Sequence, residues 1–123
     1  MSTKDTRTGA ERIADERQRQ IDKEGYKAEH DDEHTDGSLA WAAVCYAAPE
    51  AVYVRRDWAT GIHFEDPWPW SDEYDKRASR KRATAKRIRL LEMAGALIAA
   101  EIDRLLRRSK HAYPVDTQRK RSG

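Results

Sequence analysis

The sequence predicts a small all-α protein, a bundle of about three main helices with a long aromatic and proline-rich loop between the second helix and the last. Three observations predict this class. Residues 10–24 are good helix formers without proline or glycine, residues 39–48 are apolar throughout, and residues 78–108 repeat apolar side chains at the spacing of one helical face. A chain of 123 residues is long enough for one compact core.

The first helix is expected to end at Gly25, where a left-handed residue can stop it. Polar residues interrupt its inward stripe, which follows spacings of three and four and consists of Ile13, Arg17, Gln20, Ile21 and Glu24. Inward polar groups either pack loosely or are presented to a specific ligand. We therefore expect Arg17, Gln20 and Glu24 to contribute to a ligand-binding site. Residues 1–9 show no periodicity and are expected to be disordered, before a single helical domain over 10–108 and a disordered basic tail over 109–123.

The second helix is expected to be buried on all sides and to end before Pro49. Its alanines form a slim surface against which Gly95 of the last helix is expected to pack. Residues 49–78 are expected to be mostly irregular, with a helical turn near 49–55. Within them, Trp68 and Trp70 alternate with prolines and form either a lid over the core or a stacking platform for a ligand.

The last helix is expected over residues 78–108. Its inward face is predicted to consist of Leu91, Ala94, Leu97, Ile98, Ile102 and Leu105. Glu101 falls on the same face, and a buried carboxylate needs a partner. Because Arg17 is directed inward on the first helix, the sequence predicts an ion pair between Arg17 and Glu101.

An acidic block over residues 29–34 (EHDDEH) is the most unusual feature of the chain. Carboxylates at this density suit Mg²⁺ or Mn²⁺, and the expected metal ligands are Glu29, Asp31, Asp32 and Glu101. His30 to His34 also match the H-x-x-E-H pattern of some zinc proteases, but that pattern needs a longer helix than this segment allows. The alternative is a solvated acidic loop whose aspartates cap helices.

Charge is unevenly distributed along the chain. Residues 1–75 carry 9 Lys/Arg and 18 Asp/Glu, whereas residues 76–123 carry 15 and 4. The basic run from Lys76 to Arg89 is either a non-specific nucleic-acid surface or a solvated face whose positive charge balances the negative charge of the acidic block. Cys45 is expected to be a buried thiol. The chain offers no apolar run for a membrane span and no apolar region of a signal peptide at its start, so we expect a cytoplasmic protein with no membrane partner.

Several segments together resemble a family of small proteins of tailed phages and prophages. They are ERQRQ at 16–20, EGY at 24–26, EHDD at 29–32, WPW at 68–70, and AGALI with the following AEI between 94 and 102. The resemblance implies a phage context and the cytoplasm of a bacterial host. A looser similarity is to the MazG-like all-α NTP pyrophosphohydrolases. Residues 39–48 lack the carboxylates of that class, and Glu101 and Asp103 have a different spacing.

These observations predict a phage-type accessory protein that acts by binding a host protein or a small phosphorylated, nucleotide-like ligand, rather than an enzyme. One alternative is a Mg²⁺-dependent nucleotide hydrolase using Glu24, Glu29, Asp31, Asp32 and Glu101. Only the hydrolase requires three or more carboxylates to converge within metal-coordination reach. A second alternative is a non-specific nucleic-acid binder, and a homo-oligomer is compatible with each.

Overall fold

The computed structural model describes residues 5–77 and 83–112, and these contain four α-helices, a two-stranded antiparallel sheet and a 3₁₀ turn. In chain order the elements are α1 (Gly9–Glu24), α2 (Ala28–Asp32), α3 (Ser38–Ala47), β1 (Val54–Trp58), β2 (Gly61–Glu65), the 3₁₀ turn η1 (Asp72–Tyr74) and α4 (Thr84–Ala112). The molecule is a small α+β domain, so the all-α prediction is wrong.

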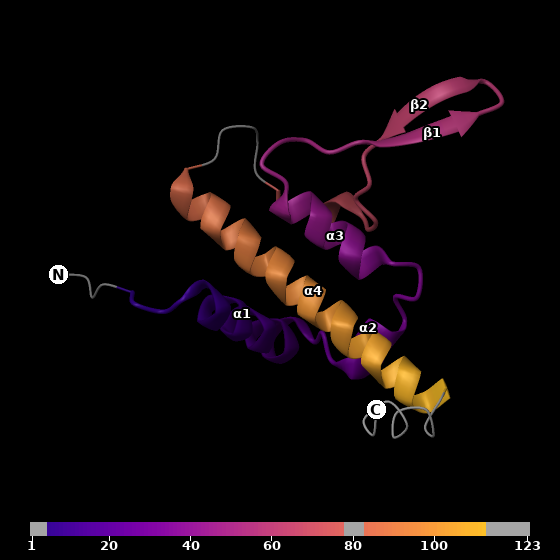
Figure 1. Cartoon of the computed structure of the whole chain (residues 1–123). Coiled ribbons are helices and arrows are strands. Elements are labelled where there is room, and N and C mark those ends of the chain that lie inside the picture. Colours follow the sequence, from indigo (N-terminus) through magenta and orange to yellow (C-terminus); the bar gives the residue numbers. More distant parts are fainter. Residues whose placement is uncertain (1–4, 78–82, 113–123) are drawn as a thin grey trace, which may run out of the picture.

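The hairpin of β1 and β2 is the element that the helical prediction missed. Its register places Arg55 opposite Phe64 and Asp57 opposite Ile62, and a two-residue turn precedes Gly61, whose φ of 126° favours glycine. The hairpin projects away from the helices (Figure 1), and nearly all of its side chains are exposed. The hairpin adds almost nothing to the core, so the periodicity of core-facing residues predicts the helices and not the hairpin.

Local sequence explains the limits of α1. Thr8 accepts a hydrogen bond from the backbone N–H of Glu11, and the Glu11 side chain accepts one from the backbone N–H of Thr8, which together form a capping box. Gly25 adopts a left-handed conformation with φ of 73° and ends the helix, as predicted. Of the segment expected to be disordered, residues 1–4 lie outside the described residues, while Asp5 and Arg7 contact each other ahead of the cap.

α4 is the central element, with α1 and α3 on opposite sides of it (Figure 1). The carbonyls of Ala47, at the end of α3, and of Ala48, just after it, accept hydrogen bonds from Arg87 near the start of α4. The core is formed by side chains of α3 and α4, namely Leu39, Ala42, Ala43, Tyr46, Leu90, Met93, Ala94, Leu97 and Ala100. Alanines in both helices allow this close approach. Cys45 is buried, as expected.

The buried face of α4 differs from the predicted one. Of the six residues expected to face inward, only Ala94 and Leu97 are buried, and the other four are exposed. Gly95 packs against α1 and not against the alanines of α3, since a Cβ at this position would lie 2.5 Å from Cδ1 of Ile13. α4 carries apolar residues on more than one side, so periodicity alone does not decide which side meets the neighbouring helices.

The limits of α4 also differ from those expected. The helix begins at Thr84 and continues to Ala112, past the expected boundary at Arg108. Residues 78–82 of the expected helix, and residues 113–123 of the expected tail, lie outside the described residues.

Candidate functional site

A cleft opens between α1, the start of α2, α4 and the segment from Pro69 to Lys76. It consists of two adjoining cavities of about 580 and 570 Å³. Both are lined by the same four residues, which join them: Glu24, Tyr26, Trp70 and Tyr74. Volumes of this size are typical of small-molecule sites.

Aromatic and charged side chains dominate the lining of the cleft. The first cavity adds Glu16, Arg19, Gln20, Tyr46, Glu73, Lys76, Lys86, Arg89, Met93 and Leu97 to the shared four. The second adds His30, His34, Pro69 and Ser71. The cleft can therefore offer stacking surfaces together with groups that recognise polar atoms.

Gln20 provides the most specific feature of the cleft. Its side chain is 3% exposed, its Nε2 donates a long hydrogen bond of 3.5 Å to Glu16, and its Oε1 has no partner among the described residues. A buried carbonyl oxygen without a donor costs about 1–3 kcal/mol. Gln20, whose side chain lines the first cavity, thus holds a buried acceptor without a partner.

Trp70 provides the complementary donor. Its indole Nε1–H is buried and has no partner among the described residues, whereas Nε1–H of Trp68 donates to the carbonyl of Ser71 at 3.1 Å. Both rings pack against the helical core, and their centroids are 5.5 Å apart. The Trp-Pro segment is therefore a lid on the core, and Trp70 also lines both cavities.

The Tyr46 hydroxyl fixes the segment that closes the cleft. It donates to the carbonyl of Tyr74 at 3.1 Å and accepts from the backbone N–H of Lys76 at 3.2 Å. Burial raises the pKa of Tyr46 to about 12, and burial together with the nearby Glu24 carboxylate raises the pKa of Tyr26 to about 12. Both phenols therefore remain protonated at neutral pH.

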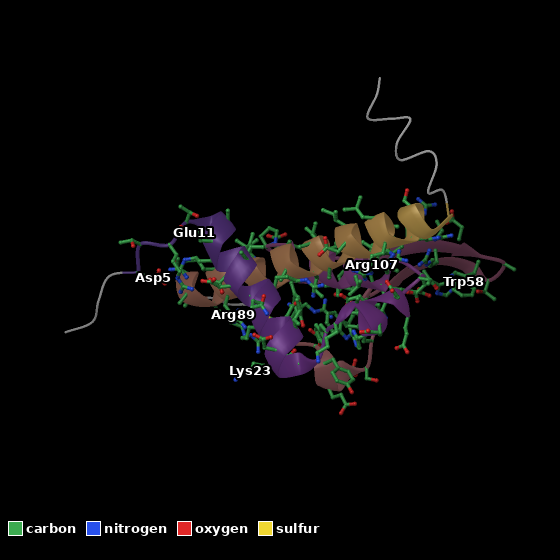
Figure 2. All side chains as sticks on the ribbon, turned by 90° about the horizontal axis from the view of Figure 1, so that it is seen from below. Asp5, Glu11, Lys23, Trp58, Arg89 and Arg107 are labelled. Atoms are coloured by element: carbon green, nitrogen blue, oxygen red, sulfur yellow. The ribbon has the colours of Figure 1, made fainter. Side chains whose placement is uncertain are left out.

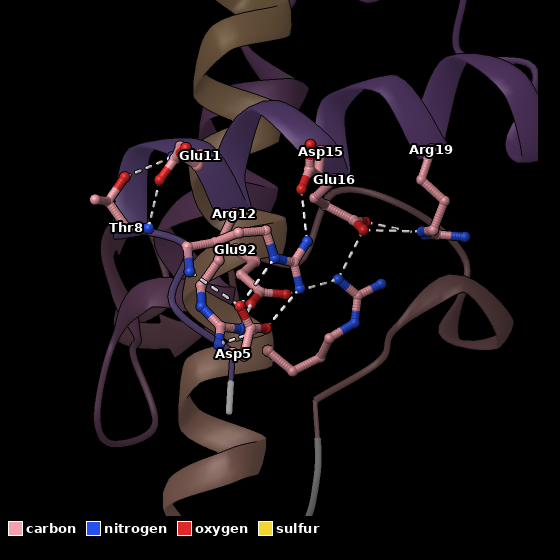
Figure 3. A network of polar contacts seen from close by, with 10 residues as sticks. Asp5, Thr8, Glu11, Arg12, Asp15, Glu16, Arg19 and Glu92 are labelled. Carbon is pink, nitrogen blue, oxygen red and sulfur yellow. Dashed lines mark hydrogen bonds and ion pairs between the residues drawn. The ribbon is translucent and has the colours of Figure 1, made fainter. Parts of the chain in front are cut away.

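Two of the cations in the cleft are already paired, as the network at the crossing of α1 and α4 shows (Figure 3). Arg19 donates to both carboxylate oxygens of Glu16, and Arg89 donates to Glu16 at 2.7 Å and to Glu92 at 3.1 Å. Burial raises the pKa of Glu16, but the hydrogen bonds from the two arginines outweigh it and hold the pKa below its usual range. Glu16 is therefore a structural carboxylate.

Lys76 and Lys86 differ from these arginines. Both line the first cavity, and neither ammonium group forms an ion pair with any described carboxylate. They are the cations of the cleft that remain available for an anionic ligand.

Histidines line the second cavity. Tyr26 stacks on His30 with a centroid distance of 4.8 Å, His30 meets His34 edge-on at 4.9 Å, and His34 contacts Trp70 at 5.2 Å. Burial lowers the pKa of His34, and the neighbouring His30 lowers it further. These ring contacts connect α2 to the Trp-Pro segment, and the lowered pKa of His34 favours the neutral form of its ring there.

The structure brings together three of the five predicted ligand-binding residues, Gln20, Glu24 and Trp70. Trp68 instead contacts Tyr46, with a centroid distance of 5.2 Å. Arg17 is also outside the cleft, because its Nη2 donates to Asp31 at 2.9 Å and its Nη1 to the carbonyl of Tyr26 at 3.2 Å.

The predicted ion pair between Arg17 and Glu101 is wrong. Glu101 accepts from Arg104, three residues further along α4, at 2.7 Å, while Arg17 pairs with Asp31. Arg17 does lie at the inner side of α1, as expected, but its partner comes from the neighbouring helix α2. The buried carboxylate that Arg17 needs is Asp31, which is fully buried and lies outside the long helix.

Three of the four predicted metal ligands pair with arginines. Asp31 pairs with Arg17, Asp32 with Arg107 at 2.8 Å and Glu101 with Arg104, while Glu29 is exposed. Within residues 5–77 and 83–112, no three His, Cys, Asp or Glu side chains are placed so that they could hold a metal ion. The arrangement of these donors does not support the Mg²⁺ or Mn²⁺ site, or the hydrolase that depends on it.

The described part of the basic run is largely occupied. Arg77 pairs with Asp66 and Asp75, Arg87 binds the carbonyls at the end of α3, and Arg89 pairs with Glu16. Lys76 and Lys86 face the cleft, and residues 78–82 are outside the described residues. The geometry therefore offers little support for a continuous nucleic-acid surface.

Sequence reasoning missed the tyrosines of the cleft, Tyr26, Tyr46 and Tyr74, and it assigned Lys76 and Lys86 only to the basic run. Tyr26 follows the glycine that ends α1, and Tyr74 follows the Trp-Pro segment, so each stands beside a predicted site residue. This proximity in sequence could have identified Tyr26 and Tyr74 as candidate site residues. The meeting of the two segments depends on the tertiary fold.

Comparison of the chain with protein-family models, with curated proteins and with solved structures finds no match in any of the three. The resemblance to phage proteins therefore stays a prediction. None of the helices in the described ranges has both the length and the apolar character needed to cross a membrane.

Proposed function

We propose that this protein is a binding module whose cleft takes a small ligand with an aromatic ring and a phosphate or similar anionic group. This choice develops one branch of the function expected from sequence, the small phosphorylated ligand. The observation that carries it is the buried, unpaired acceptor of Gln20, a residue that lines the aromatic cleft. A ligand that donates a hydrogen bond to this oxygen would remove the cost of leaving it unpaired.

The other groups of the cleft define the rest of the ligand. Tyr26, Trp70 and Tyr74 provide aromatic surfaces, and Nε1–H of Trp70 provides a donor for a ring nitrogen or carbonyl. Lys76 and Lys86 provide positive charge for a phosphate. A ring with both donors and acceptors plus an anionic group is the chemistry of a nucleotide, and it matches this combination.

The experiment is a thermal-melting series with millimolar nucleoside monophosphates of all four bases, the corresponding nucleosides, and inorganic phosphate. A ligand that binds only the folded state raises the melting temperature. At least one monophosphate should raise it more than its nucleoside or phosphate alone. If no monophosphate raises it, the proposal is wrong.

Gln20→Met identifies the cleft as the site of that effect. The change conserves volume and removes the unpaired oxygen, so the free protein should melt at or above the parent temperature while the ligand-induced rise disappears. Gln18→Met is the matched control, since Gln18 lies on the exposed side of the same helix and donates to Asp22. The control should keep the full ligand response. An unchanged response in Gln20→Met would place the ligand elsewhere.

A further inference from the structure

The outer face of α4 carries an apolar stripe that the described residues leave largely uncovered. It consists of six large aliphatic side chains that are 41–56% exposed, Ile88, Leu91, Ile98, Ile102, Leu105 and Leu106. Figure 2 shows side chains along this edge of α4 pointing away from the other elements. The stripe is separate from the cleft, whose α4 wall is formed by Lys86, Arg89, Met93 and Leu97.

The spacing of the stripe is that of a helix–helix seam. From Ile88 to Leu105 the apolar positions are separated alternately by three and four residues, if Gly95 is counted among them. Gly95 leaves no gap, because Ile13 of α1 covers it. The seam is about 26 Å long at 1.5 Å per residue, so it fits the side of another helix of similar length.

The charges beside the stripe indicate what kind of helix fits. Arg87 binds the carbonyls at the end of α3, Glu92 pairs with Arg12 and Arg89, and Glu101 pairs with Arg104. The two carboxylates are therefore neutralised within the chain, while Arg87 is held by carbonyls and keeps its charge. A partner helix with an apolar seam and neutralised carboxylates beside it would match, and α4 of a second copy has both.

The area of the stripe sets the strength of such an interface. Six half-exposed aliphatic side chains offer on the order of 500 Å² per copy, so two copies bury on the order of 1,000 Å², the lower limit for a specific interface. We propose that two copies of this chain associate through their α4 stripes as a weak, symmetric dimer. The cleft lies on the inward side of α4 and remains open in each copy, so this proposal is independent of the proposed function.

Sedimentation of the full chain over a range of concentrations, from about 1 µM to about 1 mM, tests the dimer. The parent should pass from monomer to dimer within this range, as expected of a small interface. Ile102→Lys should raise the dissociation constant at least about tenfold, because it places a charge within the seam. Leu105→Lys should act in the same direction, and circular dichroism should show both variants folded, since both side chains are half-exposed.

The matched control is Ile62→Lys in the hairpin, which is 56% exposed where Ile102 is 51% exposed. It should leave the dissociation constant unchanged. A parent that stays monomeric up to about 1 mM would overturn the proposal. It would equally be overturned if Ile62→Lys separated the copies and the α4 variants did not.

Discussion

The helical body and the hairpin contain the same kinds of interactions, but they differ in burial. Arg17 and Asp31 pair at 2.9 Å with side chains 14% and 0% exposed, whereas Arg55 and Asp57 pair at 3.0 Å with both side chains more than half exposed. Pairs of the second kind contribute little in water. An isolated two-stranded hairpin is also marginally stable by itself. The comparison indicates that the helical body carries the stability of the domain and that the hairpin can open without unfolding it.

The largest expected effect tests the buried pair. Asp31→Asn should lower the free energy of unfolding by on the order of 4 kcal/mol, because it leaves the Arg17 charge inside the fold without a charged partner. Asp57→Asn in the hairpin should change it by less than about 0.5 kcal/mol. Urea unfolding of both variants measures the difference. Similar losses in the two would contradict the comparison.

The next effect concerns apolar packing. Leu90→Ala removes a fully buried side chain from the core and should cost on the order of 3 kcal/mol through lost burial and the cavity left behind. Phe64→Ala removes a larger side chain, but one that is 67% exposed, and should stay within about 0.5 kcal/mol. Thermal and urea unfolding should rank the two in this order. A greater loss for Phe64→Ala would mean that something covers the hairpin.

Substitutions at two glycines test side-chain packing and backbone conformation one at a time. Gly95→Leu should cost about 1–3 kcal/mol by overpacking against Ile13, and Ile13→Ala in the same chain should relieve part of that cost. Gly61 has no heavy atom near its missing Cβ, but its φ of 126° strains any other residue. Gly61→Ala should therefore open the hairpin locally, as faster amide exchange in β1 and β2, with little change in global unfolding. Additive costs for Gly95→Leu and Ile13→Ala would rule out a direct contact between these two positions.

The smallest effect is a pH dependence in the helical body. The pKa of His34 in the folded state lies below the ordinary value of 6.5, so the unfolded chain binds a proton first as the pH falls. The stability is then complete above about pH 6.5 and decreases below it until the folded state also takes up the proton. His34→Gln should flatten this part of the curve relative to the parent. Parallel curves for the parent and His34→Gln would show that burial does not shift this histidine.

The same difference explains what could be predicted from the sequence. The end of α1 at Gly25 and the position of α3 followed from local residues, because caps and an all-apolar run act within a few positions. The expected burial of α3 on all sides is wrong, since Trp41 and Val44 are 40% and 42% exposed. The hairpin was missed although Ile62 and Phe64 alternate correctly, since it buries no core face. The buried face of α4 was also predicted wrongly, because four aliphatic residues expected inside lie on the exposed stripe.

The candidate site was predicted in part for a related reason. Gln20 and Glu24 were identified because they interrupt the inward stripe of α1, and Trp70 because of its proline neighbours. Arg17 was identified in the same way, but its guanidinium pairs with Asp31 and lies outside the cleft. Which segment meets α1 depends on tertiary contacts such as the Tyr46 hydroxyl bonds to residues 74 and 76, which no local pattern encodes.

The central claim, that the cleft binds a ligand through its unpaired polar groups, is tested most directly by the indole N–H signals of the tryptophans in ¹H–¹⁵N NMR spectra. Trp70→Phe assigns the signal of Trp70, which lines both cavities, and Trp58→Phe assigns that of the exposed hairpin residue. On titration with the nucleoside monophosphate that raises the melting temperature most, the Trp70 signal should move progressively to saturation while the Trp58 signal stays in place. A stationary Trp70 signal, or movement confined to Trp58, would contradict the claim.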